Sequence, residues 1–115
     1  MSQQQAFGQG GNTPPVIVAG YTNVTTAMSP YTVLATDYFL SCDATAGPIT
    51  ILLPDAPSNY RELIIKDRVG ISATNAIAIT TVGGVVTIDG ATTYNFVDNY
   101  ESLDVLFNGT SYETF

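Results

Sequence analysis

With 115 residues the chain suits a single domain, and its ten acidic residues outnumber the three basic ones, Arg61, Lys66 and Arg68, for a net charge of −7. Because phosphate backbones are bound by many lysines and arginines, this charge excludes nucleic acid and an anionic membrane surface as expected partners. The chain has no histidine and one cysteine, Cys42, which leaves no residues for histidine acid–base chemistry, an intramolecular disulfide or a zinc site.

The first 26 residues differ in composition from the rest of the chain. Residues 1–12 are rich in glutamine and glycine, a composition that is expected to be disordered by itself in water. Pro14 and Pro15 then favour an extended backbone, and residues 16–19, Val-Ile-Val-Ala, have the composition of a core strand. We therefore expect an N-terminal extension over residues 1–26 and a folded domain over residues 27–115.

From residue 16 onward, apolar residues alternate with polar ones and turn residues interrupt them, which is typical of β-strands. The expected strands are residues 16–19, 22–27, 31–34, 38–42, 49–53, 61–66, 76–81, 85–88, 93–97, 102–107 and 111–115. Gly83-Gly84 and Asn108-Gly109 each predict a hairpin between the strands that flank them. No helical periodicity persists over three turns, and no fixed repeat predicts a solenoid.

Many short strands separated by turn residues predict an all-β fold, specifically a β-sandwich with jelly-roll-like connectivity and an extended N-terminal segment. Alternation places Leu63 and Ile65 on the inner face of their strand. It also places Tyr38 in the core beside Leu40 and Cys42, which predicts a buried, inert thiol. Tyr94 is expected in the core as well, and four other tyrosines are expected to be more exposed, namely Tyr21, Tyr60, Tyr100 and Tyr112.

Five aspartates could carry chemistry, because two facing carboxylates can hydrolyse a glycosidic bond. They are Asp43, Asp67, Asp89, Asp98 and Asp104. Each is expected at or near a turn, where aspartate is favoured because its side chain bonds the local backbone. No Asp-x-Asp spacing indicates a calcium loop either. The chain is therefore not expected to be an enzyme or to hold a metal or cofactor.

Several strings between Tyr31 and Phe115 resemble a small β-module of phage tail-fibre and tailspike proteins and of other surface fibre proteins. They read YTVLATDYFLSCD, GPITILLPDAP, LIIKD, VTIDG and VLFNGTSYE. The resemblance implies an all-β, non-enzymatic protein that assembles on a virion or a cell surface. Because the strings are strand and turn patterns, they transfer no functional residue.

A sandwich has open sheet edges, and Lys66 is the one lysine available to guard them. The leading hypothesis is that the N-terminal segment inserts into a neighbouring subunit as a donated strand. A heterologous contact of this kind, if it does not close, builds a helical homopolymer, here an extracellular filament of a cell-surface appendage or a virion. The expected interface residues are Phe7, Val16, Ile17, Val18, Ala19 and Tyr21.

Two other interpretations stay open. In the first, residues 16–26 are simply the first strand of their own sandwich. In the second, the chain is an adhesin module of a phage tail fibre that binds a surface carbohydrate as a trimer, with exposed tyrosine rings stacking on sugar rings.

Overall fold

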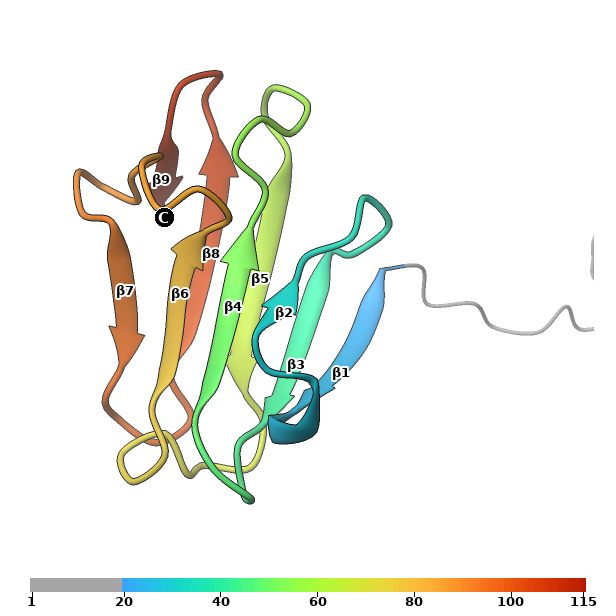
Figure 1. Ribbon diagram of the computed structural model, residues 1–115, viewed down its shortest axis with the longest axis vertical. Helices are drawn as coiled ribbons and strands as arrows, with labels where there is room; N and C mark the ends of the chain where they lie inside the picture. The colour runs from blue at the N-terminus through green and yellow to red at the C-terminus, as the bar shows by residue number, and fades with distance from the viewer. Residues whose placement is uncertain (1–19) are drawn as a thin grey trace, which may run out of the picture.

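Two β-sheets face each other in the computed structural model, which describes residues 20–115 (Figure 1). One sheet has five strands in the order β1-β3-β5-β8-β9 and the other has four in the order β2-β4-β6-β7. This confirms the all-β prediction and is compatible with a β-sandwich. The strands are β1 Tyr21–Thr25, β2 Tyr31–Thr32, β3 Phe39–Asp43, β4 Ile49–Leu53, β5 Glu62–Asp67, β6 Ile77–Thr81, β7 Thr93–Phe96, β8 Ser102–Phe107 and β9 Tyr112–Thr114, with a short 3-10 helix, η1, at Thr26–Met28.

From β1 to β6 the chain alternates between the two sheets, so that each strand lies parallel to the strand two places earlier. The last three strands instead pair antiparallel: β7 with β6, β8 with β5, and β9 with β8. The jelly-roll-like connectivity is not confirmed, because a jelly roll consists of Greek keys of antiparallel strands and four of these seven pairings are parallel.

The winding of β1 to β6 is that of a short solenoid whose turns differ in length. Paired residues in successive turns lie 18, 20, 25 and 28 positions apart, as shown by Tyr21 with Phe39, Tyr31 with Ile51, Phe39 with Ile64, and Ile49 with Ile77. A repeat whose length changes at every turn produces no fixed period in the sequence. This explains why the sequence did not predict a solenoid.

Strand positions follow the sequence pattern closely in most of the chain. Strands β4 and β8 have the predicted bounds, and the Asn108-Gly109 hairpin between β8 and β9 is confirmed. In that turn the Asn108 side-chain oxygen accepts the N–H groups of Thr110 and Ser111, at 3.0 and 2.9 Å. The predicted strand at residues 16–19 lies outside the described residues.

The hairpin predicted at Gly83-Gly84 is wrong, because β6 pairs with β7 and residues 85–88 form no strand. Ile88 instead makes isolated bridges to Ala91 and Tyr112. The Asp89-Gly90 turn folds Ile88 back onto Ala91, and the Asp89 N–H donates to the Tyr112 carbonyl at 2.9 Å. Residues 87–89 are therefore bonded to β9, while the contact of this segment with β6 is a side-chain hydrogen bond from Thr81 to the Val86 carbonyl and not a hairpin ladder.

The core fills the space between the two sheets with side chains from the inner face of each. Leu63 and Ile65 of β5 are fully buried, as predicted, and Cys42 is buried as well. Burial raises the pKa of the Cys42 thiol to about 12, so the thiol stays protonated at neutral pH. The other large, fully buried side chains are Tyr112, Phe96, Leu40, Ile49, Ile51, Leu53, Ile77, Ile79, Ile88 and Val24.

Two tyrosines occupy the opposite environment from the one predicted. Tyr38 is 42% exposed, because β3 begins one residue later, at Phe39. Tyr112 is fully buried, because the β8–β9 hairpin sets it opposite Phe107 on the inner face, with 5.2 Å between their ring centroids. Its hydroxyl donates to the Pro54 carbonyl at 2.7 Å. Tyr94 is half-buried and packs against the core.

Candidate functional site

The first strand, β1, is where the N-terminal segment meets the folded domain, at the edge of the five-stranded sheet (Figure 1). Tyr21 begins β1, and its side chain is 46% exposed. Its ring stacks on that of Phe39, with a centroid distance of 5.5 Å and an interplanar angle of 9°. Of the expected interface residues, the structure describes Tyr21; the others lie outside the described residues, namely Phe7, Val16, Ile17, Val18 and Ala19.

Strand β1 belongs to the sheet although it precedes the domain boundary expected after Thr26. It pairs in parallel with β3, and Val24 is fully buried opposite Cys42. The carbonyl of Gly20 accepts the N–H groups of both Tyr38 and Phe39, at 2.8 and 2.9 Å. Residues 20–25 of the expected extension therefore pack as part of the domain.

Asp37 ties β1 to β2, which are edge strands of different sheets. Its buried carboxylate accepts the hydroxyl of Thr22 in β1 at 2.5 Å, the hydroxyl of Tyr31 in β2 at 2.6 Å and the N–H of Leu34 at 2.8 Å. Burial, reinforced by this carboxylate, raises the pKa of Tyr31 to about 12. Arg61 encloses the cluster by donating to the carbonyls of Leu34 and Asp37. These hydrogen bonds fix β1, the first described strand of the domain, to β2 and to the loop before β3.

Sequence reasoning did not single out Asp37. The local signal is a short polar break, Ala-Thr-Asp, between two expected strands, which predicts a turn at most. Its partner Thr22 lies 15 residues away in the chain. A contact of that kind is created by the pairing of β1 with β3 and leaves no local pattern.

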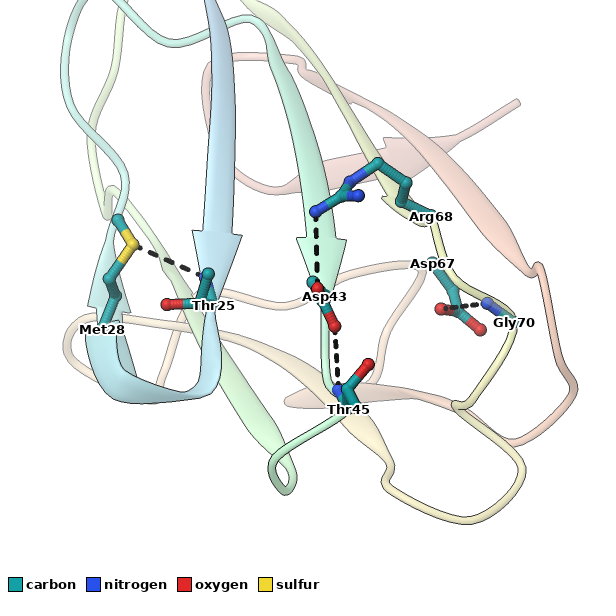
Figure 2. Close-up of polar contacts among 7 residues, drawn as sticks. All are labelled: Thr25, Met28, Asp43, Thr45, Asp67, Arg68 and Gly70. Carbon is teal, nitrogen blue, oxygen red and sulfur yellow. Dashed lines mark hydrogen bonds and ion pairs between the residues drawn. The ribbon is translucent and has the colours of Figure 1, made fainter.

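Asp67 is the last residue of the central strand β5, and its fully buried carboxylate holds the loop that follows β5 (Figure 2). It accepts the N–H groups of Gly70, Ile71, Ser72 and Tyr100 and the hydroxyl of Ser72, at 2.8 to 3.0 Å. Burial alone would raise the pKa of this carboxyl, but the hydrogen bonds outweigh it and lower the pKa. Asp67 is therefore a structural acceptor that joins the β5 loop to the β7–β8 connection.

The other candidate carboxylates lie at separate places in the fold and do not face one another as a pair. Asp43 accepts the Thr45 N–H at 3.0 Å and lies 3.6 Å from the Arg68 guanidinium (Figure 2). Asp89 accepts the N–H and hydroxyl of Thr114. Asp104 corrects the expectation of a turn, because it lies within β8, opposite Ile64. Across residues 20–115 no three metal-ligating side chains cluster together.

Exposed tyrosines do not form one platform. Tyr60 and Tyr100 are 71% and 59% exposed, and both have left-handed backbones, with φ of 64° and 63°. Each lies two residues before its strand, β5 or β8, and because these strands are antiparallel the two rings lie at opposite ends of the sheet. The ring of Tyr100 covers Gly70, with the Lys66 ammonium 5.8 Å from the ring centroid.

Comparison with models of known protein families and with curated proteins finds no match for the chain. The resemblance to phage-fibre modules therefore rests on the residues quoted above. Within residues 20–115 there is no helix of the length and hydropathy needed to cross a bilayer.

Proposed function

We propose that the protein is a non-enzymatic structural subunit that self-assembles into an extracellular filament or fibre, on a cell surface or a virion. In this proposal the N-terminal segment of one subunit inserts into the next subunit, and the repeated contact builds a helical polymer. The observation that supports it is the position of β1. The strand is held firmly by Asp37 and β3, yet it lies at a sheet edge with Tyr21 exposed. The N-terminal segment therefore joins the domain at the edge of a sheet, where a neighbouring subunit could bind it.

Deleting residues 1–19 is expected to abolish high-mass polymer and leave a folded monomer. The deletion should stop before Gly20, because the carbonyl of Gly20 accepts two backbone N–H groups and Tyr21 belongs to β1. Size-exclusion chromatography and electron microscopy measure the assembly, and circular dichroism checks that the β-sheet signal is kept. Polymer that persists in the folded, shortened protein would sink the proposal, as would a full-length protein that is always a monomer or a closed trimer.

A second candidate is the carbohydrate-binding fibre module, which the exposed ring of Tyr100 over Gly70 favours. The ring is 59% exposed although the Lys66 ammonium lies over it, 5.8 Å from the centroid, and an exposed aromatic ring is a suitable surface for stacking a sugar ring. This candidate predicts binding on a glycan array that Tyr100→Ala lowers at least about tenfold, equivalent to about 1.4 kcal/mol. Tyr38→Ala is the matched control on another exposed tyrosine. An array without any binding removes this candidate.

A further inference from the structure

Each sheet has two edge strands, β1 and β9 in one and β2 and β7 in the other. They differ in whether the N–H and C=O groups on their outer side already have hydrogen-bond partners. The outer edge of β9 is occupied by residues 87–89. The N–H of Tyr112 donates to the Thr87 carbonyl and its carbonyl accepts the Asp89 N–H, both at 2.9 Å. The Thr114 N–H donates to the Asp89 carboxylate at 3.1 Å. Strand β9 therefore has no open row of donors and acceptors for another strand.

Both edges of the four-stranded sheet are poor acceptors as well. Strand β2 has two residues and follows Pro30, which has no N–H to donate. Strand β7 has four residues, and the N–H groups of Val97 and Asp98 directly after it both donate to the Glu101 carboxylate, at 3.0 and 3.2 Å. Acidic groups beside a strand end protect that edge from pairing.

Strand β1 is different. The Gly20 carbonyl accepts the Phe39 N–H, and alternate residues of a strand bond to the same neighbour, so Thr22 and Val24 turn toward β3. The N–H and C=O groups of Tyr21, Asn23 and Thr25 then point away from the sheet. The Thr25 N–H agrees with this direction, because it donates to the Met28 sulfur at 3.5 Å, a weak acceptor (Figure 2). The strand Tyr-Thr-Asn-Val-Thr carries no charge and no proline.

The side chains around this edge also suit an apolar strand. On the outer face of the sheet, Tyr21 lies beside Phe39, and Phe39 beside Ile64, in one row across β1, β3 and β5. A strand added to β1 would extend that row and cover the exposed side of Tyr21. Residues 16–19, Val-Ile-Val-Ala, are β-branched and uncharged and span roughly 13 Å when extended, close to the length of β1.

Pairing of residues 16–18 with the β1 of their own chain would require an unfavourable turn. Folding back onto β1 would make Ala19-Gly20 a two-residue hairpin loop. The favoured hairpin turns need either glycine at the first position or positive φ at both, and here alanine comes first and glycine second. A strand from a second copy avoids this turn.

We infer that the outer edge of β1 is the acceptor, and that residues 16–19 of a second copy of this chain pair with it. The inference rests on the proposed function and specifies its contact. Because the donor and acceptor are different surfaces joined through Gly20, each added subunit offers a new edge, and the sheet continues from subunit to subunit.

Two substitutions at Asn23 test the acceptor in the full-length chain. Asn23→Pro removes an N–H that faces away from β3, and Asn23→Lys places a charge on the edge while keeping every backbone group. Both are expected to lower the polymer fraction at least tenfold, while Asn95→Lys, on exposed Asn95 of β7, leaves it unchanged. If Asn23→Pro misfolds by circular dichroism, Asn23→Lys alone decides.

The outcomes separate this inference from the proposed function. If both Asn23 variants polymerise like the wild type while the protein lacking residues 1–19 does not, the acceptor is wrong and the filament proposal stands. If the protein lacking residues 1–19 polymerises, both fall.

Cross-linking identifies the donor copy. An equimolar mixture of Ile17→Cys and Asn23→Cys subunits is expected to form a disulfide between chains, because directly opposite residues near the middle of two paired strands lie within disulfide reach. The control mixture of Ile17→Cys with Asn95→Cys should not. A disulfide that forms only when one chain carries both cysteines would show that the segment pairs with its own β1, which overturns the inference.

Discussion

Asp67→Ala is expected to lower the free energy of unfolding by about 4 kcal/mol, because several donors lose their common acceptor in a buried site. Asp67 accepts five hydrogen bonds from Gly70, Ile71, Ser72 and Tyr100, and it is fully buried. Each buried donor left unpaired costs about 1–3 kcal/mol, and water that enters the site recovers part of the loss. Urea unfolding measures the change, and thermal unfolding should show a midpoint lower by more than about 10 °C.

A graded variant and a control make this prediction specific. Asp67→Asn keeps one side-chain oxygen, which can accept the four hydrogen bonds that Oδ2 accepts in the wild type. Its amide NH2 then replaces Oδ1 and faces the Gly70 N–H, so that one hydrogen bond is lost. The expected loss of unfolding free energy is therefore about half that of Asp67→Ala. Asp43→Ala, at the end of the neighbouring strand β3, removes a solvent-accessible carboxylate and should lower the free energy of unfolding far less than Asp67→Ala does. Equal losses for Asp67→Ala and Asp43→Ala would refute the assigned role.

The same carboxylate gives the stability a defined dependence on pH. The pKa of Asp67 is lowered in the folded state from the ordinary value of 3.8, so the folded state favours the ionised form. Its contribution is therefore complete above that ordinary value and is lost as the pH falls through the lower folded pKa. The gap in stability between wild type and Asp67→Asn should narrow on acidification from about pH 7 to about pH 2. A gap independent of pH would contradict this. Asp43 and Asp89 also have lowered pKa values, so both proteins keep some acid sensitivity.

Local patterns predicted the strands well, and the pairing of those strands poorly. Alternation located β4 and β8 to the residue, because one buried face imposes a period of two on the sequence. Which strand lies beside which depends on connections, and the connections lengthen from turn to turn, so the parallel winding of β1 to β6 leaves no period to read. The Gly83-Gly84 hairpin prediction failed because β6 pairs with β7, while Ile88 bridges Ala91 and Tyr112, the second of which is distant in the chain.

The candidate site was predictable only in part. Composition distinguished the N-terminal segment from the domain, but it could not show that Tyr21–Thr25 lies in the sheet, because that depends on β3 and on the contact of Thr22 with Asp37. Aspartates at strand ends were expected to bond their own loops, and Asp43 and Asp67 do so. The Tyr100 N–H that also reaches Asp67 comes from 33 residues away and carries no sequence signal.

Tyr112→Ala is expected to cost about 3–5 kcal/mol, the range for deleting a large aromatic side chain from a packed core. The ring is fully buried against Phe107, and its hydroxyl holds the Pro54 carbonyl at the start of the β4–β5 connection. Tyr112→Phe keeps the ring and loses one hydrogen bond, so a smaller loss of about 1 kcal/mol is expected. The difference between the two variants measures the packing of the ring apart from its hydrogen bond.

Urea midpoints at unchanged m-value report these losses, with Tyr60→Ala as the control for removing an exposed tyrosine. That control should stay within about 0.5 kcal/mol of the wild type, because the ring of Tyr60 is mostly in water. The sequence pattern predicted that Tyr60 and Tyr112 are both exposed, whereas the β8–β9 hairpin turns Tyr112 inward opposite Phe107. If Tyr112→Ala lowers the free energy of unfolding as little as Tyr60→Ala does, the Tyr112 ring is not part of the core. The β8–β9 hairpin must then have a register other than the one that pairs Phe107 with Tyr112.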